Sequence, residues 1–113
     1  YANWIAALET PDGEYLYFDG PKDLFKYFDK LGEFQPGISP DKVQLYVTEY
    51  YTTRLVPATE VFFVIGSDVM GPMGEELVPV AGRDSAETFR LDHSGKALQR
   101  FDGNRLIDVT EAQ

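Results

Sequence analysis

The order of the predicted secondary-structure elements repeats along the chain, and this repeat most restricts the folds that the chain can adopt. Two strand-like segments, a helix and a further strand occur in residues 1–57 and occur again in residues 58–113. The two halves share little sequence identity, so the repeat rests on the order of the elements. Such a duplication predicts two similar units that pack on each other. We therefore predict an α+β fold of tandem duplicated ββαβ units, one in each half.

In the first half, a short turn of sequence TPDG separates two strand-like segments, residues 4–9 and 14–19, and this predicts a β-hairpin. A helix is predicted next, because Pro21 suits its first position, apolar residues recur at helical spacing and Gly32 suits its C-terminal end. Residues 42–56 are rich in β-branched and aromatic side chains, which predicts a strand with a bend midway.

The second half contains two predicted strands, a helical segment and a closing strand or hairpin, at residues 59–66, 76–82, 83–95 and 96–109. Asp84 can cap this helix, with Glu87 completing a capping box. Gly82 stands just before the helix, as Gly20 does in the first half. The apolar positions that correspond in the preceding strands are Leu16 and Phe18 in the first half, and Val78 and Val80 in the second.

Charge and composition restrict the partners. Nineteen acidic residues against ten Lys and Arg give a formal net charge of -9, and no stretch is rich in Lys or Arg. This balance argues against nucleic acid or an anionic membrane surface as a partner, and it suits a basic protein surface, cations or simple solubility. Hydrophobic residues make up 43% of the chain, enough for a packed interior, and no apolar run approaches the roughly 20 residues of a membrane span.

Both methionines lie in one turn, within the stretch VIGSDVMGPMGEEL (64–77). Where the first half turns with TPDG, the second half inserts a much longer connection that contains Met70 and Met73. Long connections on rigid strands often carry function. A thioether is a soft, neutral ligand that prefers Cu(I). The alternative is that a methionine of this turn packs on the hydrophobic layer beneath it, since Met is an adaptable packing residue.

Two thioethers make an incomplete metal site, and His93 is the single histidine that can add a third donor. His93 lies near the C-terminal end of the second predicted helix, where it can instead hydrogen-bond terminal carbonyls or interact with the helix dipole. Asp68 and Glu75 flank the methionines as further candidate cation ligands. The chain has no cysteine, and no motif pairs a serine with His93, so we predict that the protein is not an enzyme.

Three long segments have recognisable sequences: YFDGPKDLFKYF (17–28), YVTEYYTTRLVPATEVFFVIGSDVMGPMGEELVPVAG (46–82) and DHSGKALQRFD (92–102). They resemble the NosL family, the accessory lipoproteins of nitrous oxide reductase. The resemblance covers nearly the whole chain, and the block GSDVMGPMGEEL is its most specific part. It implies a fold of two ββαβ units, shared with organomercurial-lyase domains, in agreement with the repeat.

The function implied by the resemblance is that of an extracytoplasmic, lipid-anchored Cu(I) metallochaperone. Such a protein helps to assemble the copper sites of nitrous oxide reductase or a related cuproenzyme, alongside an ABC-type membrane complex. In the family, a methionine of the GPMG turn binds Cu(I). Met73 matches that methionine, and Met70 is implied only as an auxiliary ligand.

Two departures from the family pattern concern the copper site. Family members carry a cysteine in a CGM-type motif upstream of the first strand, and many have His at the position of Glu75. This chain begins at Tyr1 rather than Met, and we expect that an upstream segment, which would also carry the lipid anchor, was removed by processing or by trimming. Without the thiolate of that segment, we expect weak copper binding.

An alternative function is a protein-interaction module that keeps the NosL fold and has lost copper binding. Its acidic surface and the aromatic segment YVTEYY (46–51) would then dock a basic partner. A relation to the organomercurial lyase enzymes is a third and remote hypothesis, because the chain has no cysteine.

Overall fold

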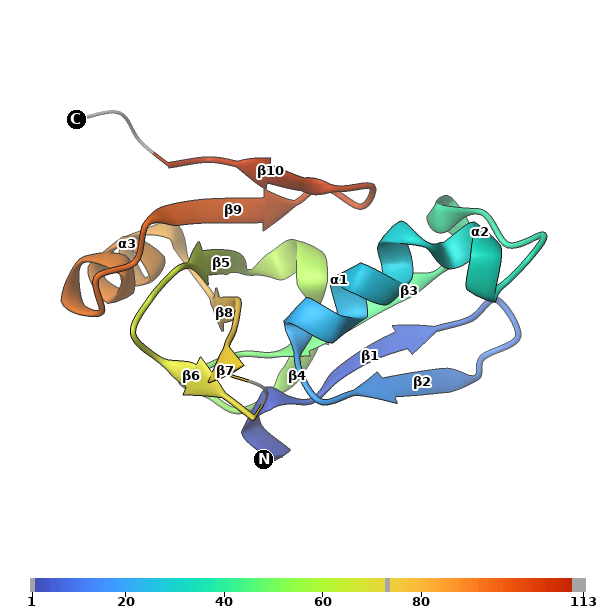
Figure 1. Cartoon of the computed structure of the whole chain (residues 1–113), viewed down its shortest axis with the longest axis horizontal. Helices are drawn as coiled ribbons and strands as arrows, with labels where there is room; N and C mark the ends of the chain where they lie inside the picture. Colours follow the sequence, from blue (N-terminus) through green and yellow to red (C-terminus); the bar gives the residue numbers. More distant parts are fainter. Residues whose placement is uncertain (1, 73, 111–113) are drawn as a thin grey trace.

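The computed structural model describes residues 2–72 and 74–110, which form two four-stranded antiparallel sheets with helices packed on them (Figure 1). The first sheet has the strand order β2-β1-β3-β4. Its strands are β1 (Ala6–Glu9), β2 (Tyr15–Phe18), β3 (Gln44–Thr48) and β4 (Leu55–Pro57). The helices of this half are α1 (Pro21–Asp29) and α2 (Leu31–Phe34), with short 3-10 turns η1 (Ala2–Trp4), η2 (Pro40–Lys42) and η3 (Ala58–Glu60).

The second sheet has the strand order β10-β9-β5-β8. Its strands are β5 (Phe62–Ile65), β8 (Val78–Val80), β9 (Ala97–Phe101) and β10 (Leu106–Asp108). The helix α3 (Arg83–Asp92) packs on this sheet. Two very short strands, β6 (Met70–Gly71) and β7 (Gly74–Glu75), form a separate two-stranded sheet within the connection from β5 to β8.

The predicted α+β class is confirmed, and the two sheets repeat the same topology. Read from the other edge, the second sheet has the order β8-β5-β9-β10, which corresponds strand by strand to β2-β1-β3-β4. Leu16 pairs with Leu8 of the first sheet as Val78 pairs with Val64 of the second. The first half also has an outer strand, β4, that the predicted ββαβ unit lacks. In the second half, the closing segment 96–109 forms the hairpin of β9 and β10, one of the two predicted alternatives. The division into domains at residue 57 stays a prediction.

The glycines before the helices have the equivalent roles that the repeat predicted. Gly20 is the N-cap of α1 and Gly82 is the N-cap of α3. The predicted capping box at the start of α3 was wrong, because Gly82 occupies the cap and no side chain bonds there. Asp84 lies within the first turn, and Glu87 forms an ion pair with Arg90 one turn further along.

Two boundaries in the first half differ from the prediction. The helix α1 ends at Asp29, and Gly32 lies inside the short helix α2 rather than ending α1. The segment 42–56 is not one bent strand, because β3 and β4 fold back on each other as an antiparallel pair. The buried Glu49 closes the turn between them, since its Oε1 accepts hydrogen bonds from the backbone N–H groups of Tyr51 (3.0 Å) and Thr52 (2.8 Å).

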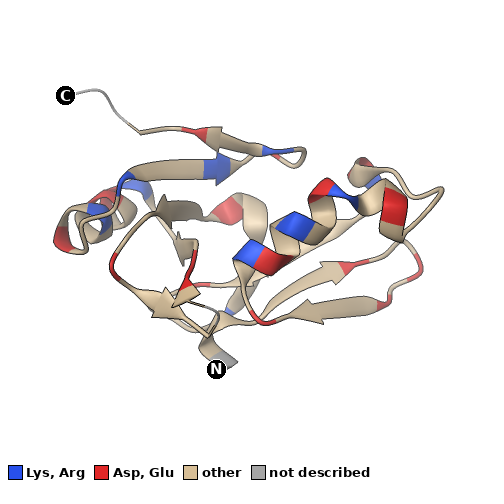
Figure 2. Cartoon of the chain, in the orientation of Figure 1, with Lys and Arg blue, Asp and Glu red and all other residues tan. Residues whose placement is uncertain are grey.

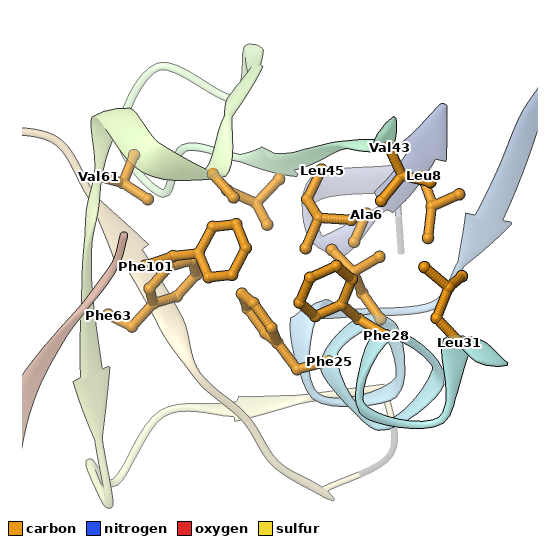
Figure 3. Close-up of a cluster of buried hydrophobic side chains, with 13 residues drawn as sticks. Ala6, Leu8, Phe25, Phe28, Leu31, Val43, Leu45, Val61, Phe63 and Phe101 are labelled. Carbon is orange, nitrogen blue, oxygen red and sulfur yellow. The ribbon is translucent and has the colours of Figure 1, made fainter. Parts of the chain in front are cut away.

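The helix α1 lies between the two sheets and completes the main hydrophobic core (Figure 3). Phe25 meets Phe63 of β5 and Phe101 of β9 edge to face, with ring centroids 5.4 Å and 5.3 Å apart. The next residue of β5, Val64, belongs to a second cluster beneath α3. The strand β5 is therefore buried on both faces, by α1 on one side and by α3 on the other.

Candidate metal site at the methionine loop

The connection from β5 to β8, residues 66–77, is the insertion that the repeat singled out, and we call it the methionine loop. It folds into a small hairpin in which Met70 pairs with Glu75, and Gly71 with Gly74. The side chain of Met70 is 60% exposed, so this methionine does not pack into the hydrophobic layer beneath. Met73, the methionine that matches the family ligand, lies outside the described residues.

The first end of the methionine loop is attached to the C-terminus of α3. The backbone N–H of Asp68 donates a 2.8 Å hydrogen bond to the carbonyl of His93, the residue that caps α3. The carboxylate of Asp68 also lies 3.0 Å from Nδ1 of the His93 ring. The His93 ring therefore contacts a side chain of the loop, while the backbone N–H of His93 donates a 3.0 Å hydrogen bond to the carbonyl of Phe89. Its ring packs on Phe89, with the centroids 4.3 Å apart.

The other end of the methionine loop is attached to the first helix by Glu76. This side chain is only 4% exposed, and its Oε1 accepts hydrogen bonds from the backbone N–H groups of Lys22 (2.7 Å) and Leu77 (2.9 Å). Burial raises the pKa of the Glu76 carboxyl, and the two backbone hydrogen bonds oppose this rise. A Cβ at Gly20 would lie 2.1 Å from Oε2, so only glycine leaves room for this carboxylate.

A pocket of about 370 Å³ borders the exposed methionine, and it is lined by Asn3, Trp4, Tyr50, Val69 and Met70. The rings of Trp4 and Tyr50 meet edge to face with centroids 6.2 Å apart. The turn η1, which contributes Asn3 and Trp4, lies beside the β6–β7 hairpin (Figure 1). The N-terminal side of the described chain is thus adjacent to the methionine loop.

The structure places two of the three predicted ligands in one region. Met70 is on the loop, and His93 is bonded to Asp68, two residues before it. Their roles as ligands stay predictions. Among residues 2–72 and 74–110, no group of three or more His, Asp or Glu side chains is arranged to hold a metal ion. Exposed Glu75 pairs with Met70 across the hairpin.

Trp4 and Tyr50 are the pocket residues that sequence reasoning missed. Tyr50 packs on Phe89, with ring centroids 4.9 Å apart. It nevertheless also borders Met70. The single tryptophan of the chain, two residues before β1, was the available indication.

Comparison with known proteins agrees with this architecture. The NosL family model matches residues 1–105, so the chain belongs to the NosL family. A solved structure with similar architecture is the copper chaperone NosL from Shewanella denitrificans, with a TM-score of 0.69 and 26% sequence identity. The similarity covers 87% of this chain and 75% of that one. No curated protein sequence matches the chain. Within the described residues, no helix has the length and apolar character needed to cross a membrane.

Proposed function

We propose that this protein binds Cu(I) as cargo at the methionine loop and passes it to a partner protein. The observation that carries the proposal is the placement of Met70, an exposed thioether on a loop attached at both ends, in a chain of the NosL family. The similarity to a copper chaperone supports the same function. The protein would act by binding and transfer rather than by catalysis.

The donor set of the described residues suits a soft cation but is incomplete. The Met70 thioether favours Cu(I) over hard cations. The carboxylate of Asp68 faces Nδ1 of His93, and in metal sites such a contact directs the opposite ring nitrogen, Nε2, towards the metal. We propose that Met73 is the principal ligand of the loop. A thiolate from a segment preceding Tyr1 would complete the site, and the neighbouring position of Trp4 supports this assignment.

An exposed, incomplete site suits delivery of the ion. Because the Met70 side chain is largely accessible, a donor group of a second protein can approach a bound ion without opening the loop. The attachments at Asp68 and Glu76 hold the backbone of the loop during such an exchange. By family resemblance, we propose nitrous oxide reductase or a related cuproenzyme as the recipient, with an ABC-type membrane complex. The setting would be extracytoplasmic, with a lipid anchor on the preceding segment.

The proposal is tested by anaerobic Cu(I) competition against a chelator, with the protein extended at its N-terminus by the cysteine-containing segment that the family resemblance implies. We expect one Cu(I) per chain, and Met73→Leu should weaken binding at least about tenfold, or about 1.4 kcal/mol. Met70→Leu should weaken it less. Phe34→Leu is the control, because this exposed residue of α2 lies at the far end of the molecule from the loop (Figure 1). Equal affinities of Met73→Leu and Phe34→Leu would overturn the ligand assignment.

Trp4 provides a second readout. It is the only tryptophan, and it shares a pocket with Met70. Cu(I) bound at the loop should change its fluorescence with the same stoichiometry as the chelator titration. Transfer is then tested by mixing the loaded protein with copper-free nitrous oxide reductase. If the loaded protein retains the ion, nitrous oxide reductase is not the recipient. That result would not contradict the proposed binding site at the methionine loop.

A further inference from the structure

The outer face of the first sheet carries a group of exposed aromatic and aliphatic side chains. Along β2, Tyr15 and Tyr17 alternate with the inward Leu16 and Phe18, and they are 44% and 66% exposed. Tyr17 and Tyr46 pair with Ala7 of β1 from either side. The members of this surface, which we call the tyrosine face, are Ala7, Glu9, Tyr15, Tyr17, Tyr46 and Leu55.

The pseudo-repeat shows that this face differs from its counterpart in the second sheet. Ala7 on β1 corresponds to Phe63 on β5, because both lie midway in the first strand of their unit. Phe63 is covered by Phe25 of α1 and is completely buried. The same helix packs on the first sheet too, but on its opposite face, through Ala6 and Leu8. Ala7 is itself buried, but Tyr15, Tyr17 and Leu55 on the same face are exposed. The tyrosine face thus has the position of an interface, and these side chains remain accessible.

The charge of the tyrosine face indicates what can bind there. Glu9 lies at the end of its middle strand β1 and accepts a 3.1 Å hydrogen bond from the hydroxyl of Tyr46. Asp12 and Glu14 lie in the adjoining turn, and residues 5–18 contain no Lys or Arg (Figure 2). Tyrosine rings attract guanidinium groups through their faces, and a neighbouring carboxylate adds a charge-assisted hydrogen bond.

We propose that the tyrosine face docks an arginine-bearing surface of a partner protein. A second copy of this chain is disfavoured, because it would bring Glu9, Asp12 and Glu14 of both copies together in a protein of net charge -9. Nucleic acid is disfavoured by the same charge. Strands about 4.8 Å apart and only a few residues long give a small flat face, which suits a weak, transient contact. The proposal does not depend on copper binding.

The experiment uses two synthetic probes of equal length and charge, one arginine-rich and one lysine-rich, with binding followed by amide NMR shifts. We expect the arginine probe to bind more tightly, because guanidinium stacks on tyrosine rings better than ammonium does. The shifts should centre on Glu9, Tyr15, Tyr17 and Tyr46. Raising the salt concentration should weaken binding. Equal affinity for both probes, or shifts centred on other elements, would overturn the proposal.

Matched variants locate the contact. Tyr17→Ser should weaken binding of the arginine probe roughly threefold, and the double variant with Tyr15→Ser about tenfold. Tyr51→Ser is the control, because this tyrosine is 60% exposed but lies in the β3–β4 turn. Glu9→Gln tests the carboxylate and leaves the rings in place. A self-association that Tyr17→Ser abolishes would instead assign the face to a second copy and contradict the proposal.

Discussion

The carboxylate of Glu76 accepts a 2.7 Å hydrogen bond from the backbone N–H of Lys22. A residue of the second unit thus caps helix α1 of the first unit. The N-cap position of α1 is Gly20, which has no side chain to do this. The first N–H groups of a helix need acceptors from outside it. Glu76 is that acceptor, and it stands at the end of the methionine loop.

Replacing Glu76 with Ala should lower the free energy of unfolding by about 1–3 kcal/mol, because the half-buried backbone N–H groups of Lys22 and Leu77 would lose their acceptor. The measurement is urea denaturation followed by circular dichroism. Glu75→Ala is the control, since this neighbour is exposed and should change stability by less than about 0.5 kcal/mol. Equal losses in the two variants would show that the capping contact contributes little.

The pH dependence of stability should report the Glu76 charge. Its carboxyl has an ordinary pKa of 4.5, and burial raises that pKa in the folded protein. Between the two values the folded state holds more protons than the unfolded state, so this residue makes the free energy of unfolding fall as pH rises. In Glu76→Gln that component should be absent. Urea titrations across this pH window measure the free energy of unfolding of both proteins. Parallel pH profiles of the two proteins would contradict this role of Glu76.

Glu49 should make the free energy of unfolding rise with pH, the opposite of the effect of Glu76. Burial alone would raise its pKa, but hydrogen bonds from the backbone N–H groups of Ala81, Thr52 and Tyr51 together lower it. Its contribution to stability is therefore complete above the ordinary value of 4.5 and is lost as pH falls through the lower folded value. Glu49→Gln should flatten the acid limb of the stability profile. An unchanged acid limb would refute this role.

Two glycine substitutions should change the free energy of unfolding in opposite directions. In Gly20→Ala the new methyl would lie 2.1 Å from Oε2 of Glu76, and moving that carboxylate would break its hydrogen bonds. We expect a loss of about 1–3 kcal/mol. Gly32→Ala lies in the helix α2 with nothing within 4 Å of its Cβ, so it should gain up to about 1 kcal/mol. Thermal denaturation of both variants tests the pair, and a stabilising Gly20→Ala would be inconsistent with the crowded carboxylate.

The contact of Asp68 with His93 should restrain the methionine loop. Asp68→Ala should speed amide hydrogen exchange at Val69 and Met70, because the loop would lose one of its attachments to α3. Global stability should change by less than about 1 kcal/mol, since the pair is near the surface. Asp12→Ala, in the exposed β1–β2 turn, is the control and should leave these exchange rates unchanged. Unchanged exchange rates at Val69 and Met70 in Asp68→Ala would show that the contact of Asp68 with His93 does not restrain the methionine loop.

Local patterns predicted the helix α1, because Pro21 and the apolar spacing lie within that segment. The insertion in the second hairpin was predicted by comparing the two halves of the repeat. The β3–β4 turn was missed because it has no glycine or proline, and Thr53 adopts a left-handed conformation with φ of 59°. The contact of Glu76 with Lys22 spans 54 positions, so no local pattern indicates it. At the site, sequence identified the methionines and His93, but the proximity of Trp4 depends on how the two units pack.

The placement of Phe25 between the sheets has a consequence for how the duplicated halves behave as fragments. A peptide of residues 1–57 would leave Phe25 without Phe63 and Phe101, and a peptide of residues 58–113 would expose those rings to water. Each half lacks what the other provides, so the halves should melt together in one cooperative transition. An ancestral single copy with this sequence pattern would have gained the missing surface by pairing with its own twin.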